Sequence, residues 1–170
     1  MTSRFGQTRV GIVVVAYNAE TTLEKTLDRI PSDIAGSIST VIVCDDASKD
    51  ATHEVALAYQ RANDHLPLRV VRHPVNLGYG GNQKAGYQLA AEMGIDIAVL
   101  LHGDGQYAPE VMMEIIQPLV DGSADAVFGS RMMNRGAARE GGMPLYKYVG
   151  NKILTTYENA MTGADLSEWH

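Results

Sequence analysis

The sequence predicts an α/β fold in which a mostly parallel sheet is covered by helices on both faces. Three observations carry this prediction. Five short runs rich in valine and isoleucine recur about every 30 residues, which is room for a strand, a helix and two loops. The runs are almost continuously apolar, as strands covered on both faces are. The segments between them place apolar residues at helical spacing.

Each element has its own local signal. The predicted strands are Val10–Ala16, Ile38–Cys44, Leu68–His73, Ile95–Leu101 and Ala124–Gly129. Helical spacing predicts helices around Leu23–Ile30, Val55–Ala62, Met112–Leu119 and Leu145–Met161. Asp50 suits a helix N-cap and Pro109 a first helical turn, whereas Gly94 and Gly122 suit helix ends. The other connections, Ser32–Ser37 among them, look like ordinary turns.

Length and composition narrow the class of protein. The 170 residues fit one domain, residues 1–170, and 45% apolar with 20% charged residues is typical of a globular protein. A net charge of −6 gives little electrostatic case for binding nucleic acid. The apolar runs fall short of the roughly 20 residues of a membrane span, and the polar start does not resemble a signal peptide. The single cysteine, Cys44, fits a reducing compartment, so we expect a cytoplasmic protein.

Polar and glycine-rich segments follow the predicted strands at one edge of the sheet. They comprise residues 17–18, 45–50, 76–84, 102–106 and 130–131. Parallel sheets bind ligands beyond the carboxyl ends of their strands. The sequence therefore predicts the functional site at this edge.

Asp104 and Gln106 lie two residues apart just beyond the fourth predicted strand, so in an extended chain their side chains point the same way. A carboxylate and an amide oxygen suit a hard divalent cation, Mg²⁺ or Mn²⁺, that takes its other ligands from substrate phosphates. His102 has the same parity and either helps to hold the ion or makes a hydrogen bond nearby. The alternative is a Gly-Asp-Gly turn without a ligand.

Asp45 and Asp46 end the second predicted strand, where adjacent carboxylates repel each other and need partners if they are buried. We interpret Asp45 as an acceptor of hydrogen bonds from a nucleotide base or ribose. Local capping of the helix that begins near Asp50 is the alternative.

Two further segments are rich in glycine. Residues 78–84 match neither a P-loop nor the dinucleotide fingerprint, and they enter a helix whose N-terminus attracts phosphate, with Lys84 one turn in. A plain tight turn explains these glycines equally well. Residues 130–144 combine glycines with arginines, which favours either a mobile lid over phosphate or a disordered connection. The apolar stripe that follows suits core packing, although its Tyr/Lys face also suits a membrane surface.

Five segments taken in order carry a resemblance to a known family. They are Val-Val-Ala-Tyr-Asn-Ala-Glu (14–20), Val-Cys-Asp-Asp-Ala-Ser-Lys-Asp-Ala-Thr (43–52), Asn-Leu-Gly-Tyr-Gly-Gly (76–81), Gly-Asp-Gly-Gln-Tyr (103–107) and Gly-Ser-Arg (129–131). Together they resemble a family 2 glycosyltransferase of the GT-A fold, closest to the dolichol-phosphate mannosyltransferase-like branch. The resemblance runs from Val10 to about Asp165 and implies a Rossmann-like, mostly parallel sheet.

The resemblance implies a role for each segment. Nucleotide binding is expected from Tyr17, Asn18, Glu20, Asp45, Asp46, Gly78, Lys84 and Gly103. Asp104 with Gln106 is expected to hold the metal on the diphosphate. His102 stands where the family motif usually has an aspartate, so the site loses one negative charge. Asp104 and Arg131 are the expected catalytic groups, and Asp165 is the candidate base for an alcohol acceptor.

The predicted activity is inverting, metal-assisted transfer of a sugar from a UDP- or GDP-linked donor to a polyprenyl phosphate or a saccharide. The chain ends near where relatives carry further acceptor-side structure, so we expect truncation there and peripheral contact with the cytoplasmic face of a membrane. The alternative is a non-catalytic nucleotide-sugar-binding module with a degenerate metal motif. Two other classes of protein are disfavoured by the residues after the first predicted strand. A sugar nucleotidyltransferase would need a loop rich in glycine and arginine there, and a phosphoacceptor domain would need an acidic pair. This chain has Tyr17-Asn18 at that place.

Overall fold

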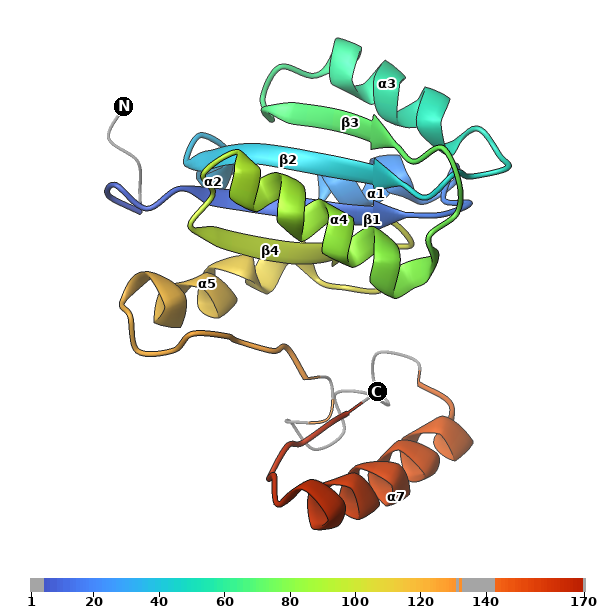
Figure 1. Cartoon of the computed structure of the whole chain (residues 1–170), viewed down its shortest axis with the longest axis vertical. Helices are drawn as coiled ribbons and strands as arrows, with labels where there is room; N and C mark the ends of the chain where they lie inside the picture. The colour runs from blue at the N-terminus through green and yellow to red at the C-terminus, as the bar shows by residue number, and fades with distance from the viewer. Residues whose placement is uncertain (1–4, 131, 133–142, 170) are drawn as a thin grey trace. The chain divides into compact units, whose positions relative to one another are not determined.

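The computed structural model describes residues 5–130, 132 and 143–169. These residues form two compact units, divided between Val127 and Phe128. The first unit contains the sheet, and the second is built around one long helix (Figure 1). That the whole chain acts as a single domain stays a prediction.

Four parallel strands form the sheet of the first unit, in the order β3-β2-β1-β4. Their bounds are β1 Val10–Ala16, β2 Ile38–Asp45, β3 Leu68–Arg72 and β4 Ile97–His102. Val15 of β1 lies beside both Cys44 of β2 and His102 of β4. The carboxyl ends of these three strands therefore reach the same edge together.

Strand β1 is completely buried because both faces of the sheet are covered. Ile12 and Val14 pack into a core with helices α1 (Leu23–Asp28), α2 (Ser32–Ala35), α3 (Thr52–Ala62) and α5 (Met112–Val120). Val13 and Val15 pack on the other face beneath α4 (Gly78–Glu92), which crosses in front of the sheet in Figure 1. Gly86 permits this close approach, because a Cβ there would overlap Val13. The α/β class is confirmed, and the expected burial on both faces holds for β1 and β2, whereas β3 and β4 keep exposed positions.

The helix ends follow the signals in the sequence. Gly94 and Gly122 adopt left-handed φ angles of 70° and 68° after α4 and α5. The N-cap of α3 is Ala51 rather than the predicted Asp50, although Asp50 Oδ1 accepts the N–H of Thr52, the first residue of the helix, at 3.0 Å. Pro109 begins a single 3-10 turn, η1 (Pro109–Val111), that leads directly into α5.

Two predictions about secondary structure are wrong. The fifth strand, Ala124–Gly129, is not formed: these residues have irregular backbone, and Phe128 is 86% exposed. Alanine, aspartate and glycine fill most of this segment and favour strands little, so a single Val-Phe pair cannot bury a face. The connection at Ser32–Ser37 is not a plain turn but contains α2, because Ile34 and Ala35 are buried in the core.

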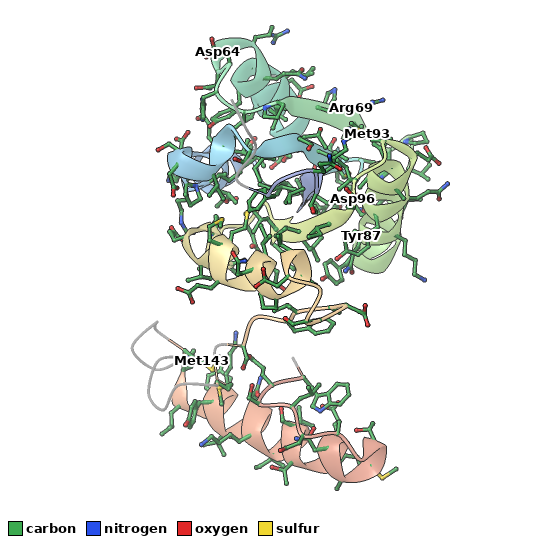
Figure 2. The ribbon with its side chains drawn as sticks, turned by 90° about the vertical axis from the view of Figure 1, so that its left-hand side faces the viewer. Asp64, Arg69, Tyr87, Met93, Asp96 and Met143 are labelled. Atoms are coloured by element: carbon green, nitrogen blue, oxygen red, sulfur yellow. The ribbon has the colours of Figure 1, made fainter. Side chains whose placement is uncertain are left out.

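Hydrogen bonds link the loops at the opposite, amino-terminal edge of the sheet. The backbone N–H of Arg9 donates to Asp96 Oδ2, and its Nη1 donates to the carbonyl of Met93, both at 2.8 Å. Arg69 of β3 lies beside Met93 (Figure 2), with Nη1 3.9 Å from the sulfur. This edge is therefore occupied by structural contacts.

The second unit consists of α7 (Leu145–Thr162) and a terminal segment that folds back on it. Asn159 Oδ1 accepts the N–H of Leu166 at 3.2 Å and the indole N–H of Trp169 at 2.7 Å. The predicted apolar stripe lies on α7, but its side chains stay exposed rather than packed in a core. Among the helices that the structure describes, none is both long and apolar enough to cross a membrane.

Candidate functional site

An open cavity of about 210 Å³ lies at the carboxyl edge of the sheet, beside the start of α4. It is lined by Val15, Ala16, Tyr17, Ala19, Asp46, Tyr79, Asn82, His102, Gly103 and Asp104. Five of the residues singled out in the sequence are among them: Tyr17, Asp46, His102, Gly103 and Asp104. Ligands of parallel sheets bind at this position.

The end of β1 is tied to the loop after β2 by reciprocal hydrogen bonds. Asn18, with a left-handed φ of 50°, donates its N–H to Ser48 Oγ and accepts the N–H of Lys49 on Oδ1, both at 3.0 Å. Glu20 Oε2 accepts the N–H of Ala51 at 2.9 Å. Asn18 and Glu20 therefore hold the wall of the cavity together, while the ring of Tyr17, 45% exposed, borders the opening.

The two adjacent aspartates have different surroundings. Asp45 is fully buried: its Oδ1 accepts the N–H of Ser48 at 3.1 Å, and its Oδ2 lies 3.3 Å from Nε of Arg72. Asp46 lines the cavity, and its Oδ1 accepts the N–H of Leu77 at 2.7 Å. The structure therefore brings Asp46 to the site and places Asp45 behind it, paired with a cation.

The glycine-rich segment forms the first turn of α4. Gly78 has a left-handed φ of 73°, and its N–H donates to Asn76 Oδ1 at 3.0 Å. Lys84 is exposed on α4 and is not among the residues that line the cavity. Asn82, which the sequence did not single out, is buried there and joins the carbonyl of Cys44 to His73, each at 3.0 Å. Its only sequence signal is its place in this segment.

The chain turns sharply after β4 instead of staying extended. Gly105 has a φ of 76°, and Asp104 Oδ1 accepts the N–H of Gln106 at 3.0 Å. The side chain of Asp104 borders the cavity, whereas Gln106 is not part of its lining. The prediction that the side chains of Asp104 and Gln106 point the same way required an extended chain. The left-handed conformation of Gly105, which lies between them, breaks that condition.

His102 sits in an aromatic cluster at the floor of the cavity. Its Nε2 lies 3.2 Å from the hydroxyl of Tyr79, and its ring centroid lies 4.2 Å from that of Tyr107. Burial lowers the pKa of His102 and outweighs the opposing effect of Asp104. Burial, with the proximity of Tyr107 and Tyr87, raises the pKa of Tyr79. The cluster therefore presents a neutral imidazole beside the carboxylate of Asp104.

These donors fit a divalent cation that is shared with a diphosphate. Within the described parts of the chain, no three His, Cys, Asp or Glu side chains gather as a self-sufficient metal centre. A cation that keeps waters and takes oxygens from phosphates needs only one or two protein ligands. Asp104 offers a carboxylate at the cavity, and a ring nitrogen of His102 is the second available donor type.

Two predicted catalytic residues follow the first unit in the sequence. Arg131 lies outside the described residues. Asp165 is exposed in the second unit, after α7. Their roles stay predictions.

A comparison with known families identifies the chain. Residues 11–164 match the model of glycosyl transferase family 2. The chain belongs to this family. Among solved structures, this glycosyltransferase is similar to glucosyl-3-phosphoglycerate synthase from Mycobacterium tuberculosis, determined with Mn²⁺, UDP and glucosyl-3-phosphoglycerate. The TM-score is 0.52 and the identity 26%, over 67% of this chain and 40% of that one. The predicted family and the GT-A fold are confirmed.

Two curated relatives of this family 2 glycosyltransferase have names that specify a dolichol phosphate. The UDP-N-acetylglucosamine–dolichyl-phosphate N-acetylglucosaminyltransferase of Methanococcus voltae is 31% identical over 85% of this chain and 59% of its own length. The dolichol-phosphate mannosyltransferase of Pyrococcus furiosus is 28% identical over 85% of this chain and 38% of its own. The chain thus spans well under two thirds of either relative.

Proposed function

We propose that this glycosyltransferase moves a sugar from a UDP- or GDP-linked donor to the phosphate of a polyprenyl lipid, with inversion and with the help of a divalent cation. The observation that carries the proposal is one cavity lined by both Asp46 and Asp104, at the carboxyl edge of the sheet. Support also comes from the names of the relatives, which specify dolichyl phosphates, and of the solved synthase, which was determined with UDP and Mn²⁺.

The nucleoside end of the donor is assigned to the wall formed by Tyr17 and Asp46. The ring of Tyr17 offers a face for a base, and the carboxylate of Asp46 offers an acceptor for a base N–H or a ribose hydroxyl. Asp45 then acts from behind, because its carboxylate is already shared between Ser48 and Arg72. Asn18 and Glu20 keep this wall in place through the loop after β2.

The diphosphate end is assigned to the loop after β4. A cation bound by Asp104 would neutralise the charge that grows on the departing diphosphate. Gly103 brings the backbone close to the cavity, and Lys84, Arg131 and the start of α4 at Gly78 are the proposed further contacts for anionic groups.

A lipid phosphate explains why a strong base is not required at this site. Its oxygen is already ionised at neutral pH, so the nucleophile needs orientation rather than deprotonation. Asp165 remains the proposed base only for an alcohol acceptor. A lipid acceptor would bring the reaction to a membrane surface, and we propose the cytoplasmic face.

One observation favours a second candidate, a nucleotide-sugar-binding module that does not turn over. The site carries His102 rather than a second carboxylate, so it offers a cation one negative charge fewer. Such a module would bind the donor without releasing sugar.

The test is sugar transfer by the purified chain, with UDP- and GDP-sugars, Mn²⁺ or Mg²⁺, and a polyprenyl phosphate in detergent. We expect lipid-linked sugar in the organic extract, and a loss of about a hundredfold in rate for Asp104→Asn. Asp96→Asn, at the opposite edge of the sheet, is the matched control and keeps the rate. Donor binding without transfer to any acceptor would support the non-catalytic module, and neither binding nor transfer would refute both.

A further inference from the structure

Three side chains on one face of α1 reach across to the loop that carries Asp104. Thr22, Thr26 and Arg29 occupy positions i, i+4 and i+7, so they point the same way from the helix and its two caps. Thr22 Oγ1 donates to the carbonyl of Gly103 at 2.7 Å, and Thr26 Oγ1 lies 3.5 Å from the same oxygen. Arg29 Nη1 donates to the carbonyl of Gly105 at 2.9 Å.

Arg29 is itself fixed by a second partner. Its Nε and Nη2 donate to the two carboxylate oxygens of Glu110 at 2.7 and 3.0 Å. The hydrogen bond with Arg29 lowers the pKa of Glu110, so the pair stays charged throughout the neutral range. All three nitrogens of the guanidinium are therefore engaged, which a lysine ammonium cannot reproduce.

The result is that the backbones of both glycines that flank Asp104 are held. The N–H of Gly103 donates to the carbonyl of Val15 at 2.9 Å, and its own carbonyl is held by Thr22. The carbonyl of Gly105 is held by Arg29. None of these bonds uses the carboxylate of Asp104, which stays at the cavity.

The amino-terminal end of α1 is also anchored to the nucleoside wall. The N–H of Ala19, which lines the cavity, donates to Thr52 Oγ1 at 2.7 Å, and the carbonyl of Ala19 accepts the N–H of Leu23 at the start of the helix. Helix α1 with its two caps therefore joins this wall of the cavity to the loop that carries Asp104.

We propose that Thr22 and Arg29 are positioning residues, which fix Asp104 at the distance from the nucleoside wall that a metal-bound diphosphate requires. The identity of the ligand rests on the proposed function; the restraint on the loop does not. A residue that supports a metal ligand from behind typically changes metal affinity by tenfold or more.

The test measures two quantities on the full 170-residue chain, for Arg29→Met, Arg29→Lys and Thr22→Val. The first is the affinity for Mn²⁺ at saturating UDP or GDP, measured from the EPR signal of free Mn²⁺. The affinity for the nucleotide without metal is measured beside it. The second is amide hydrogen exchange of residues 103–106. Arg61→Met removes the same charge from the last turn of α3 and is the matched control.

We expect Arg29→Met to weaken Mn²⁺ binding about tenfold and to speed exchange in the loop, while nucleotide affinity without metal is unchanged. Thr22→Val follows in the same direction, Arg29→Lys is intermediate, and Arg61→Met matches the parent. Mn²⁺ affinity and exchange both equal to the parent would overturn the inference. If the parent chain itself binds no Mn²⁺ in the presence of nucleotide, the proposed metal site is wrong. Hydrogen exchange of residues 103–106 that is unchanged in the variants would independently refute the restraint on the loop.

Discussion

Replacing Arg72 with methionine removes the cation that partners the buried Asp45. The Oδ2 of Asp45 lies 3.3 Å from Nε of Arg72 in an ion pair and accepts no hydrogen bond, so the substitution removes the charge that compensates this buried oxygen. Removing one partner of a fully buried pair costs about 3–5 kcal/mol. The Arg72 side chain is 40% exposed and Asp45 Oδ1 keeps its bond from Ser48, so water and the remaining donor reduce the cost to about 2 kcal/mol.

The assay is urea denaturation of Arg72→Met, Asp45→Asn and the double variant. We expect Arg72→Met to lose about 2 kcal/mol of unfolding free energy, and a lower melting temperature by about 4–8 °C. The double variant should lose less than the sum of the single variants, because the orphaned charge is gone. A loss below about 0.5 kcal/mol for Arg72→Met, or strict additivity, would refute the reasoning.

Three further predictions concern packing, charge and reactivity. Gly86→Ala should cost about 1–3 kcal/mol in urea denaturation, because the new methyl overlaps the strand beneath α4, whereas Gly80→Ala, which meets open space, should cost nothing; equal effects would contradict the packing. Arg29 lowers the pKa of Glu110 below its ordinary value of 4.5. The stabilisation by this ion pair is therefore fully present above pH 4.5 and is lost as the pH falls through the lowered pKa of Glu110 in the folded protein. Thermal unfolding of Arg29→Met should therefore lack this acid-dependent part, and an unchanged acid profile would speak against it. Burial raises the pKa of Cys44 to about 11, so a disulfide reagent at pH 8 should label it only on unfolding; rapid labelling of the native protein would show the burial to be wrong.

The sheet could be predicted from the sequence because its signals are local. Runs such as Val10–Ala16 are apolar at every position, and this pattern requires a strand covered on both faces. The fifth predicted strand does not form because Ala124–Gly129 lacks this continuous apolar pattern and has too few large apolar side chains to stabilise pairing with the sheet. Glycines with left-handed φ, such as Gly94, were equally readable.

The site could be located from the sequence but not resolved into roles. Which of Asp45 and Asp46 reaches the cavity depends on the pairing with Arg72, a residue on another strand. The parity argument for Asp104 and Gln106 failed because the conformation of Gly105 cannot be read from spacing. The contact of Arg29 with the loop joins residues far apart in the chain, where local patterns carry no information.

A calorimetric titration of the chain with UDP and GDP, with and without Mn²⁺, tests whether a cation at Asp104 anchors the nucleotide. We expect that one nucleotide binds, that Mn²⁺ strengthens its binding, and that Asp104→Ala abolishes the effect of Mn²⁺ while leaving metal-free binding in place. Binding that ignores both Mn²⁺ and Asp104, or no binding of either nucleotide by the folded chain, would contradict this role of the cation.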